Sequence, residues 1–93
     1  MITVHAKFHS HFKELASTGE DSFVIEIPTV SEFAKCICDK YGSRMRAMLI
    51  DPKTNELNER GTMFVNEKGM RVSAEDTLED GETITFLVGI AGG

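Results

Sequence analysis

The sequence has few of the features that mark secreted, membrane or nucleic-acid-binding proteins. Its two cysteines, Cys36 and Cys38, stand one residue apart, which excludes the disulfide framework of a small secreted domain. No apolar stretch approaches the length of a membrane span, and the first residues lack the pattern of a signal peptide. Lysine and arginine number 10 against 15 acidic residues, and the formal net charge of −5 argues against a nucleic-acid binder. We therefore expect a cytoplasmic protein that binds neither nucleic acid nor membrane.

The remaining composition is that of one small globular domain. The chain has 93 residues, of which 41% are hydrophobic and 27% are charged, so it can bury one modest core. No internal repeat or low-complexity segment interrupts it. The acidic balance favours solubility and a basic partner.

Two stretches near the start alternate between apolar and polar residues, as half-buried strands do. The first covers residues 2–8 and the second covers residues 23–27. The side chains expected to face the core are Ile2, Val4, Ala6 and Phe8 in the first strand and Phe23, Ile25 and Ile27 in the second. Residues 10–22 are mostly polar around Phe12 and Leu15, so we expect a connection with one helical turn. The two strands would then form a hairpin.

The segment after Pro28 carries the clearest helix pattern in the chain. Thr29 is a favourable N-cap, and Glu32 three residues later completes a capping-box pattern. One helical face is formed by Val30, Phe33, Ala34, Ile37 and Tyr41. Gly42 is placed to end the helix in a left-handed conformation. The pattern therefore predicts a helix over residues 30–41.

The middle of the chain gives weaker signals. Residues 43–50 predict either a short second helix or a strand near residues 46–50. The polar residues 51–61 are typical of a flexible loop. Residues 62–66 then predict a strand, and after a turn residues 70–72 predict a short strand that returns along it.

The last strand has apolar residues on both faces, which is typical of a central strand. On one face lie Ile84, Phe86 and Val88, and on the other lie Thr83, Thr85 and Leu87. Before the strand, Leu78 is expected to be buried under a polar loop, and Asp80 and Gly81 to form the turn. We expect this strand to pair in parallel with the first strand. The predicted fold class is α+β, a β-grasp (ubiquitin-like) arrangement of a mixed four- to five-stranded sheet with one main helix across it.

The sequence ends on two glycines, and we expect residues 1–88 to form the domain and residues 89–93 a flexible tail. Paired terminal glycines also occur as frayed ends without function. Here they follow a strongly patterned strand, residues 83–93 carry no charged side chain, and we expect that no protease is needed to expose the carboxylate of Gly93. A Gly92–Gly93 end can thread a narrow channel because it has no side chains. An ATP-using partner can convert its carboxylate into an acyl adenylate, which sulfur or an amine then attacks.

Several short motifs resemble, in order and spacing, those of the ubiquitin-like sulfur-carrier family, the MoaD/ThiS group that includes the small subunit of molybdopterin synthase. They are "FHSHFKELAST" with Lys13, Glu14 and Leu15 at the basic–acid–leucine positions, "TVSEF" from Thr29, "FVN" from Phe64 to Asn66, and "TLEDGETITFLVGIAGG" at the end. The resemblance covers nearly the whole length. It implies that Gly93 is the functional residue and that Gly92 is its unhindered neighbour.

This resemblance implies a sulfur carrier, a protein cosubstrate and not an enzyme. A ubiquitin-activating-type enzyme would consume ATP to adenylate Gly93, which then becomes a thiocarboxylate, while the chain itself binds no cofactor. The sulfur would pass to molybdopterin on a synthase large subunit, or to an acceptor in cysteine, methionine or thiamine synthesis. A protein modifier joined to lysines through the same glycine stays open as the alternative. Gly89 replaces a proline found in many members, and residues 51–61 are longer than in the shortest members, so the activating enzyme and the acceptor stay open.

We expect the end of the last strand and the neighbouring sheet face to bind partners. The residues assigned to this role are Phe86, Leu87, Val88, Gly89, Ile90 and Ala91. Leu87 and Ile90 are expected on the outer sheet face and in the tail, and ubiquitin-like domains commonly bind through that face. Five acids cluster just before the last strand: Glu75, Asp76, Glu79, Asp80 and Glu82. They predict a solvated loop, with a docking patch for basic residues of the activating enzyme as the alternative.

Two further groups of residues have ordinary explanations. His5, His9 and His11 would need to converge to bind a metal, and exposed strand histidines are far more common, so we expect no metal site. Cys36 and Cys38 lie about 200° apart around a helix, so they can neither pair nor bind one metal together. We expect Cys38 to be buried and Cys36 to be more exposed.

Overall fold

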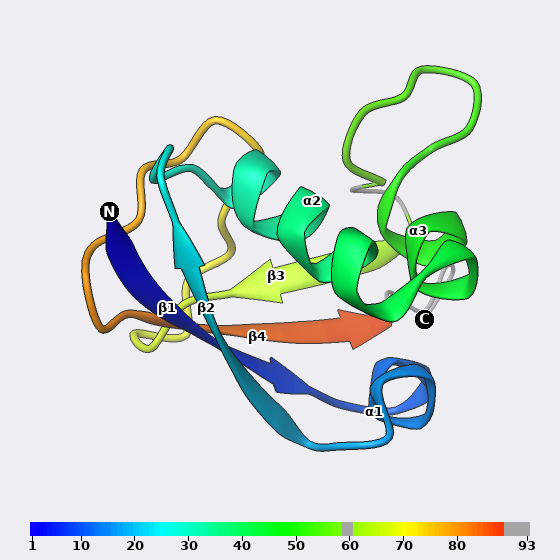
Figure 1. Cartoon of the computed structure of the whole chain (residues 1–93), viewed down its shortest axis with the longest axis horizontal. Coiled ribbons are helices and arrows are strands. Elements are labelled where there is room, and N and C mark those ends of the chain that lie inside the picture. The colour runs from blue at the N-terminus through cyan, green and yellow to red at the C-terminus, as the bar shows by residue number, and fades with distance from the viewer. Residues whose placement is uncertain (59–60, 89–93) are drawn as a thin grey trace.

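The structure, a computed structural model, describes residues 1–58 and 61–88, in which four strands form one sheet crossed by a long helix (Figure 1). In chain order the elements are β1 Ile2–Phe8, α1 His11–Ala16, β2 Glu20–Ile25, α2 Val30–Tyr41, α3 Ser43–Leu49, β3 Thr62–Val65 and β4 Thr83–Val88. The order of strands across the sheet is β2-β1-β4-β3. Strand β4 is parallel to β1 and antiparallel to β3, and β1 and β2 are antiparallel. The predicted hairpin and the predicted central, parallel position of the last strand are therefore both confirmed.

The strand predicted at residues 70–72 is wrong, because this segment makes only a single bridge to the sheet. Val65 forms an isolated bridge with Arg71, and the N–H of Val72 donates to the carbonyl of Phe64 at 2.8 Å. The Oδ1 atom of Asn66 accepts the N–H groups of residues 68 and 70 at 2.9 and 3.0 Å. This side chain closes the turn, and pairing does not extend beyond the one bridge.

Strand β2 differs from its predicted range at both ends. It begins at Glu20 and not at residue 23, and it ends at Ile25. Ile25 pairs with Ile2, the first residue of β1, so the strand has no partner beyond this point. Ile27, expected to face the core, is 56% exposed. The prediction for Ile27 was wrong because β1 is too short to continue the sheet that far.

Helix α2 begins and ends at the predicted residues. The Oγ1 atom of Thr29 accepts the N–H of Glu32 at 3.2 Å, as an N-cap should. Gly42 has the expected positive φ of 90°, although its ψ of −164° lies outside the left-handed helical region. Its N–H donates to the carbonyl of Cys38, and its own carbonyl accepts the N–H of Arg46. Gly42 therefore ends α2 and opens α3, which makes residues 43–49 a helix and not a strand.

The core lies between α2 and the sheet and is centred on one aromatic ring. Phe86 of β4 has ring centroids of four other phenylalanines within 5.3–6.1 Å: Phe8, Phe12, Phe33 and Phe64. Phe12 belongs to α1, which is a six-residue helix and not the single turn expected. Leu78 is 3% exposed beneath its polar loop, as predicted. The turn after it is held to β1, since the N–H of Gly81 donates to the carbonyl of Thr3 at 2.7 Å.

The polar segment after α3 is a loop, as predicted, and it is closed by its own hydrogen bonds. The N–H of Asp51 donates to the carbonyl of Glu56 at 2.8 Å, and Ile50 forms a bridge with Leu57. The N–H of Asn58 donates to the carbonyl of Leu49 at 2.7 Å. These bonds bury Leu57 against the end of α3. The flexibility expected for residues 51–61 stays a prediction.

Candidate functional site

The candidate site is the end of β4, which is held on both sides by other strands. Val88 pairs with Thr62 of β3, and the N–H of His9, just after β1, donates to the carbonyl of Phe86 at 3.2 Å. The backbone is thus fixed up to the last residue of the strand. Five predicted site residues lie outside the described residues: Gly89, Ile90, Ala91, Gly92 and Gly93. Their assigned roles stay predictions.

Phe86 does not offer its side chain to a partner, which corrects its assignment as a partner-binding residue. Its side chain is fully buried at the centre of the aromatic cluster. In β4, side chains alternate between the two faces of the sheet, and Phe86 points towards α2, whose Phe33 ring lies 5.6 Å away. Phe86 contributes to the site by anchoring the end of β4 in the core, on the face of the sheet that α2 covers.

Leu87 lies on the opposite, outer face of the sheet, as predicted, and two residues of β3 lie beside it. Leu87 pairs with Met63, and Thr85 pairs with Val65. Met63, Val65 and Leu87 are each partly exposed, and we call these three the outer-face patch. Sequence reasoning missed Met63 and Val65 as site residues. Their alternation with the buried Thr62 and Phe64 was the available signal.

Several carboxylates of the acidic segment before β4 accept hydrogen bonds from backbone N–H groups. Asp80 Oδ1 accepts the N–H of Thr3 at 2.8 Å, and Glu82 Oε1 accepts the N–H of Glu79 at 2.9 Å. Asp76 Oδ2 likewise accepts a backbone N–H at 2.9 Å. These carboxylates therefore shape the turns that lead into β4. The segment lies at the start of β4, and six residues of strand place the other end about 17 Å away.

The two cysteines are poor nucleophiles in this fold. Cys38 is buried and Cys36 is partly exposed, as predicted. Burial, with a smaller contribution from Asp39, raises the pKa of Cys38 to about 11 against the opposing effect of Arg46. Burial and the charges of Glu32 and Asp39 also raise the pKa of Cys36. Neither thiol is set up as a thiolate that could relay sulfur.

The three histidines do not converge. Nδ1 of His5 lies 2.8 Å from Oγ of Ser22 on the sheet, whereas Nδ1 of His11 lies 3.1 Å from a carboxylate oxygen of Glu14 within α1. Residues 1–58 and 61–88 contain no cluster of three histidine, cysteine or acidic side chains that could hold a metal ion. Within the same ranges, no helix is both long enough and apolar enough to span a membrane.

Solved structures of small ubiquitin-like proteins resemble this chain along its whole length. Small archaeal modifier protein 1 of Haloferax volcanii superposes with a TM-score of 0.80 at 12% identity, covering 98% of this chain and 99% of its own. A putative molybdopterin converting factor subunit 1 from Pyrococcus furiosus has a TM-score of 0.74 at 17% identity, covering 97% and 100%. Small archaeal modifier protein 1 of Methanosarcina acetivorans has a TM-score of 0.73 at 21% identity, covering 100% and 98%.

This chain has the ubiquitin-like β-grasp fold. The solved structures that share it include a molybdopterin converting factor subunit and small archaeal modifiers, which is consistent with the resemblance to the MoaD/ThiS group. No protein-family model matches the chain, and no curated protein sequence matches it significantly. Because a fold alone does not assign a function, the function of this β-grasp protein has to be inferred from its site.

Proposed function

We propose that this β-grasp protein is a sulfur carrier whose Gly93 is adenylated by a partner enzyme and converted to a thiocarboxylate. The observation that carries the proposal is the position of Gly92 and Gly93, a few residues beyond the central strand β4 of a β-grasp sheet. A carboxylate flanked by no side chain suits a narrow active site in another protein. Because β4 is hydrogen-bonded to its neighbouring strands, the docked domain can present the carboxylate of Gly93 from a rigid strand.

The chemistry uses this chain as a substrate and the partner as the catalyst. A carboxylate oxygen of Gly93 attacks the α-phosphorus of ATP, and pyrophosphate leaves, which produces an acyl adenylate. A hydrosulfide-equivalent sulfur supplied by a partner attacks the carbonyl carbon, and AMP leaves. The resulting thiocarboxylate carries an anionic sulfur that can be donated to an acceptor. Cys36 and Cys38 take no part, because both thiols have raised pKa values.

The outer-face patch of Met63, Val65 and Leu87 is the proposed docking surface for the activating enzyme. It lies at the β3–β4 side of the sheet, next to the end of β4. A partner that covers it would hold the domain close to Gly93. A molybdopterin-synthase-type large subunit is the corresponding candidate acceptor, supported by the likeness to the Pyrococcus furiosus subunit.

A protein modifier is the second candidate, favoured by the likeness to small archaeal modifier protein 1 from two organisms. In that case the amine of a lysine attacks the adenylated or thioesterified Gly93, and an isopeptide bond forms. The acyl adenylate is common to both functions, so the same docking surface serves either one. The two differ in the product that accumulates in cells.

Intact-mass spectrometry of protein isolated from its native cells tests the proposal. A carrier should show a population heavier by the difference between one sulfur and one oxygen atom, whereas a modifier should appear in lysine adducts of much higher mass. Deletion of Gly93, or addition of one alanine after it, should abolish both products. The core side chains among the described residues lie between Val4 and Phe86, so these variants should unfold at the temperature of the unchanged chain.

An extended variant that still forms the thiocarboxylate, or still complements the native function, would contradict the proposal. A matched control is Ile27→Ala, since Ile27 is 56% exposed, follows β2 at the sheet edge opposite β3 and lies outside the tail. Its products should be those of the unchanged protein.

A further inference from the structure

The two edges of this sheet are protected in different ways. An edge strand presents unpaired backbone N–H and C=O groups, which readily pair with a strand of another molecule. At the β3 edge the chain covers itself: the N–H of Val72 donates to Phe64 and the N–H of Asn66 donates to the carbonyl of Met70 at 2.9 Å. At the other edge, β2 has no such covering segment among the described residues.

The pairing of β2 with β1 identifies the backbone groups that face the free edge. Alternate residues of an antiparallel strand direct their N–H and C=O groups to the partner strand, and the others direct them away. The N–H of Phe8 donates to the carbonyl of Gly19 at 2.9 Å, so the odd-numbered residues of this strand face β1. The backbone groups of Glu20, Ser22 and Val24 therefore face outward.

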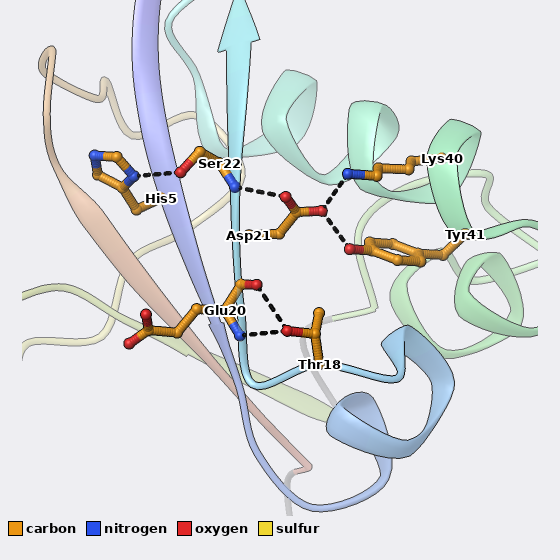
Figure 2. A network of polar contacts seen from close by, with 7 residues as sticks. All are labelled: His5, Thr18, Glu20, Asp21, Ser22, Lys40 and Tyr41. Carbon is orange, nitrogen blue, oxygen red and sulfur yellow. Dashed lines mark hydrogen bonds and ion pairs between the residues drawn. The ribbon is translucent and has the colours of Figure 1, made fainter.

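Two neighbouring side chains occupy these outward groups (Figure 2). The hydroxyl of Thr18 donates to the carbonyl of Glu20 at 3.0 Å and accepts its N–H at 3.4 Å. Oδ1 of Asp21 accepts the N–H of Ser22 at 2.8 Å. Both backbone groups of Glu20 and the amide of Ser22 thus have local partners, and none of these partners belongs to another strand.

Asp21 is itself fixed from the helix layer. Its second oxygen, Oδ2, accepts a hydrogen bond from the Tyr41 hydroxyl and one from Nζ of Lys40 at 2.5 Å, both at the end of α2 (Figure 2). Lys40 Nζ also lies 5.4 Å from the centroid of the Phe23 ring. One oxygen of Asp21 is therefore anchored to α2 while the other holds the edge amide of Ser22.

We propose that Thr18 and Asp21 close the β2 edge against pairing with a second copy of this chain. A second copy of the chain is the partner that such an edge can accept, because two identical edges can pair about a twofold axis. Two β2 strands related by a twofold axis can pair antiparallel about Ser22, with each Ser22 amide donating to the carbonyl of the other. In this register Val24, 62% exposed on the same strand, lies opposite Glu20 of the second copy. The bond from Ser22 to Asp21 competes directly with the central pair of this dimer.

The test compares two variants that differ only at Asp21. Tyr41→Phe removes one anchor but leaves the carboxylate on the Ser22 amide, so this variant should stay monomeric. Asp21→Ala combined with Tyr41→Phe frees that amide without leaving the tyrosine hydroxyl unpaired. Sedimentation velocity at millimolar concentration should show its mass doubled. Sulfate buffer favours the folded state of both, and circular dichroism of the same samples verifies it.

A third variant identifies the interface. Ser22→Pro, added to the double variant, removes the edge N–H and should return the protein to a monomer, because proline is tolerated only where a strand faces solvent. A folded double variant that stays monomeric overturns the proposal. Association that persists after Ser22→Pro overturns it as well, since the copies would then meet elsewhere. Neither result bears on the sulfur-carrier function, which depends on Gly93.

Discussion

At the scale of single residues, the contact between Asp21 and Tyr41 alters the acidity of both groups. Burial acts to raise the pKa of the Asp21 carboxyl, but hydrogen bonds from Lys40, Tyr41 and the N–H of Ser22 outweigh it and lower the pKa below its ordinary value. Burial, followed by the hydrogen bond to Asp21 and its charge, raises the pKa of Tyr41 to about 12. The contact therefore favours an ionised Asp21 beside a protonated Tyr41.

The first prediction is the alkaline titration of Tyr41. Because the chain has one tyrosine and no tryptophan, phenolate absorbance reports this residue alone. The midpoint should lie at about pH 12 in the folded protein and at about pH 10 in urea. Since the folded pKa is the higher one, the stabilisation is complete below about pH 10 and is lost as the pH rises through 12. If the midpoint is the same in the folded protein and in urea, the Tyr41 hydroxyl does not donate a hydrogen bond to Asp21.

The second prediction concerns the thiols. With a pKa of about 11 and little exposure, Cys38 should resist iodoacetamide at about pH 8 until the protein unfolds. Cys36 is partly exposed and should react first, yet more slowly than in urea, because its pKa is also raised. Mass spectrometry of timed samples measures both reactions. Cys36→Ser should leave a single labelling event that requires unfolding, and rapid labelling of that variant while folded would contradict the prediction.

At the scale of elements, two adjacent residues of β4 have different roles: Phe86 stabilises the core, and Leu87 is proposed to bind a partner. Phe86→Ala removes the ring at the centre of the core and should cost about 3–5 kcal/mol. Leu87→Ala removes an outer-face side chain and should cost about 1 kcal/mol or less. Urea unfolding measures both values. In the adenylation reaction Leu87→Ala should raise the KM for this protein, because it weakens docking. An unchanged KM would show that the outer-face patch is not the docking surface for the activating enzyme.

The elements that the sequence predicted best are those whose side chains carry their own signal. Helix α2 has a cap, an apolar face and a terminal glycine, and its range was predicted to the residue. The first half of β2 has Glu20, Asp21 and Ser22 in place of alternating apolar residues, so only its pairing with β1 reveals it. The end of the same strand is set by the length of β1. Neither the start nor the end of β2 can therefore be predicted from the residues of β2 alone.

The candidate site was predictable to a similar degree. The glycines and the central strand were visible in the sequence, as was the outer position of Leu87. Phe86 was misassigned because residues 86–91 were assigned to partners as one stretch, although the outer position of Leu87 implies that Phe86 points the other way, towards α2. Met63 and Val65 joined the site because β3 pairs with β4, a contact between segments far apart in the chain.

At the scale of the whole molecule, charge is distributed unevenly along β4. Acidic side chains gather before its start, whereas the other end of the strand lies about 17 Å away. A partner that docks at the end of β4 can therefore meet the acidic segment only through a second, distant region of its surface. Over such a distance the charges act mainly on the rate of encounter.

The last prediction follows from this separation. Glu79→Lys reverses a charge in the acidic segment while leaving Glu82, which holds the turn, in place. It should slow association with a basic activating enzyme several-fold at low ionic strength and weaken the dependence of that rate on salt, with little effect on the dissociation rate. Asp39→Lys on α2 changes the net charge equally but lies outside the segment. Stopped-flow measurements across a salt series compare the two. If both variants slow association equally, net charge alone steers the encounter, and the acidic segment serves only to shape the turns before β4.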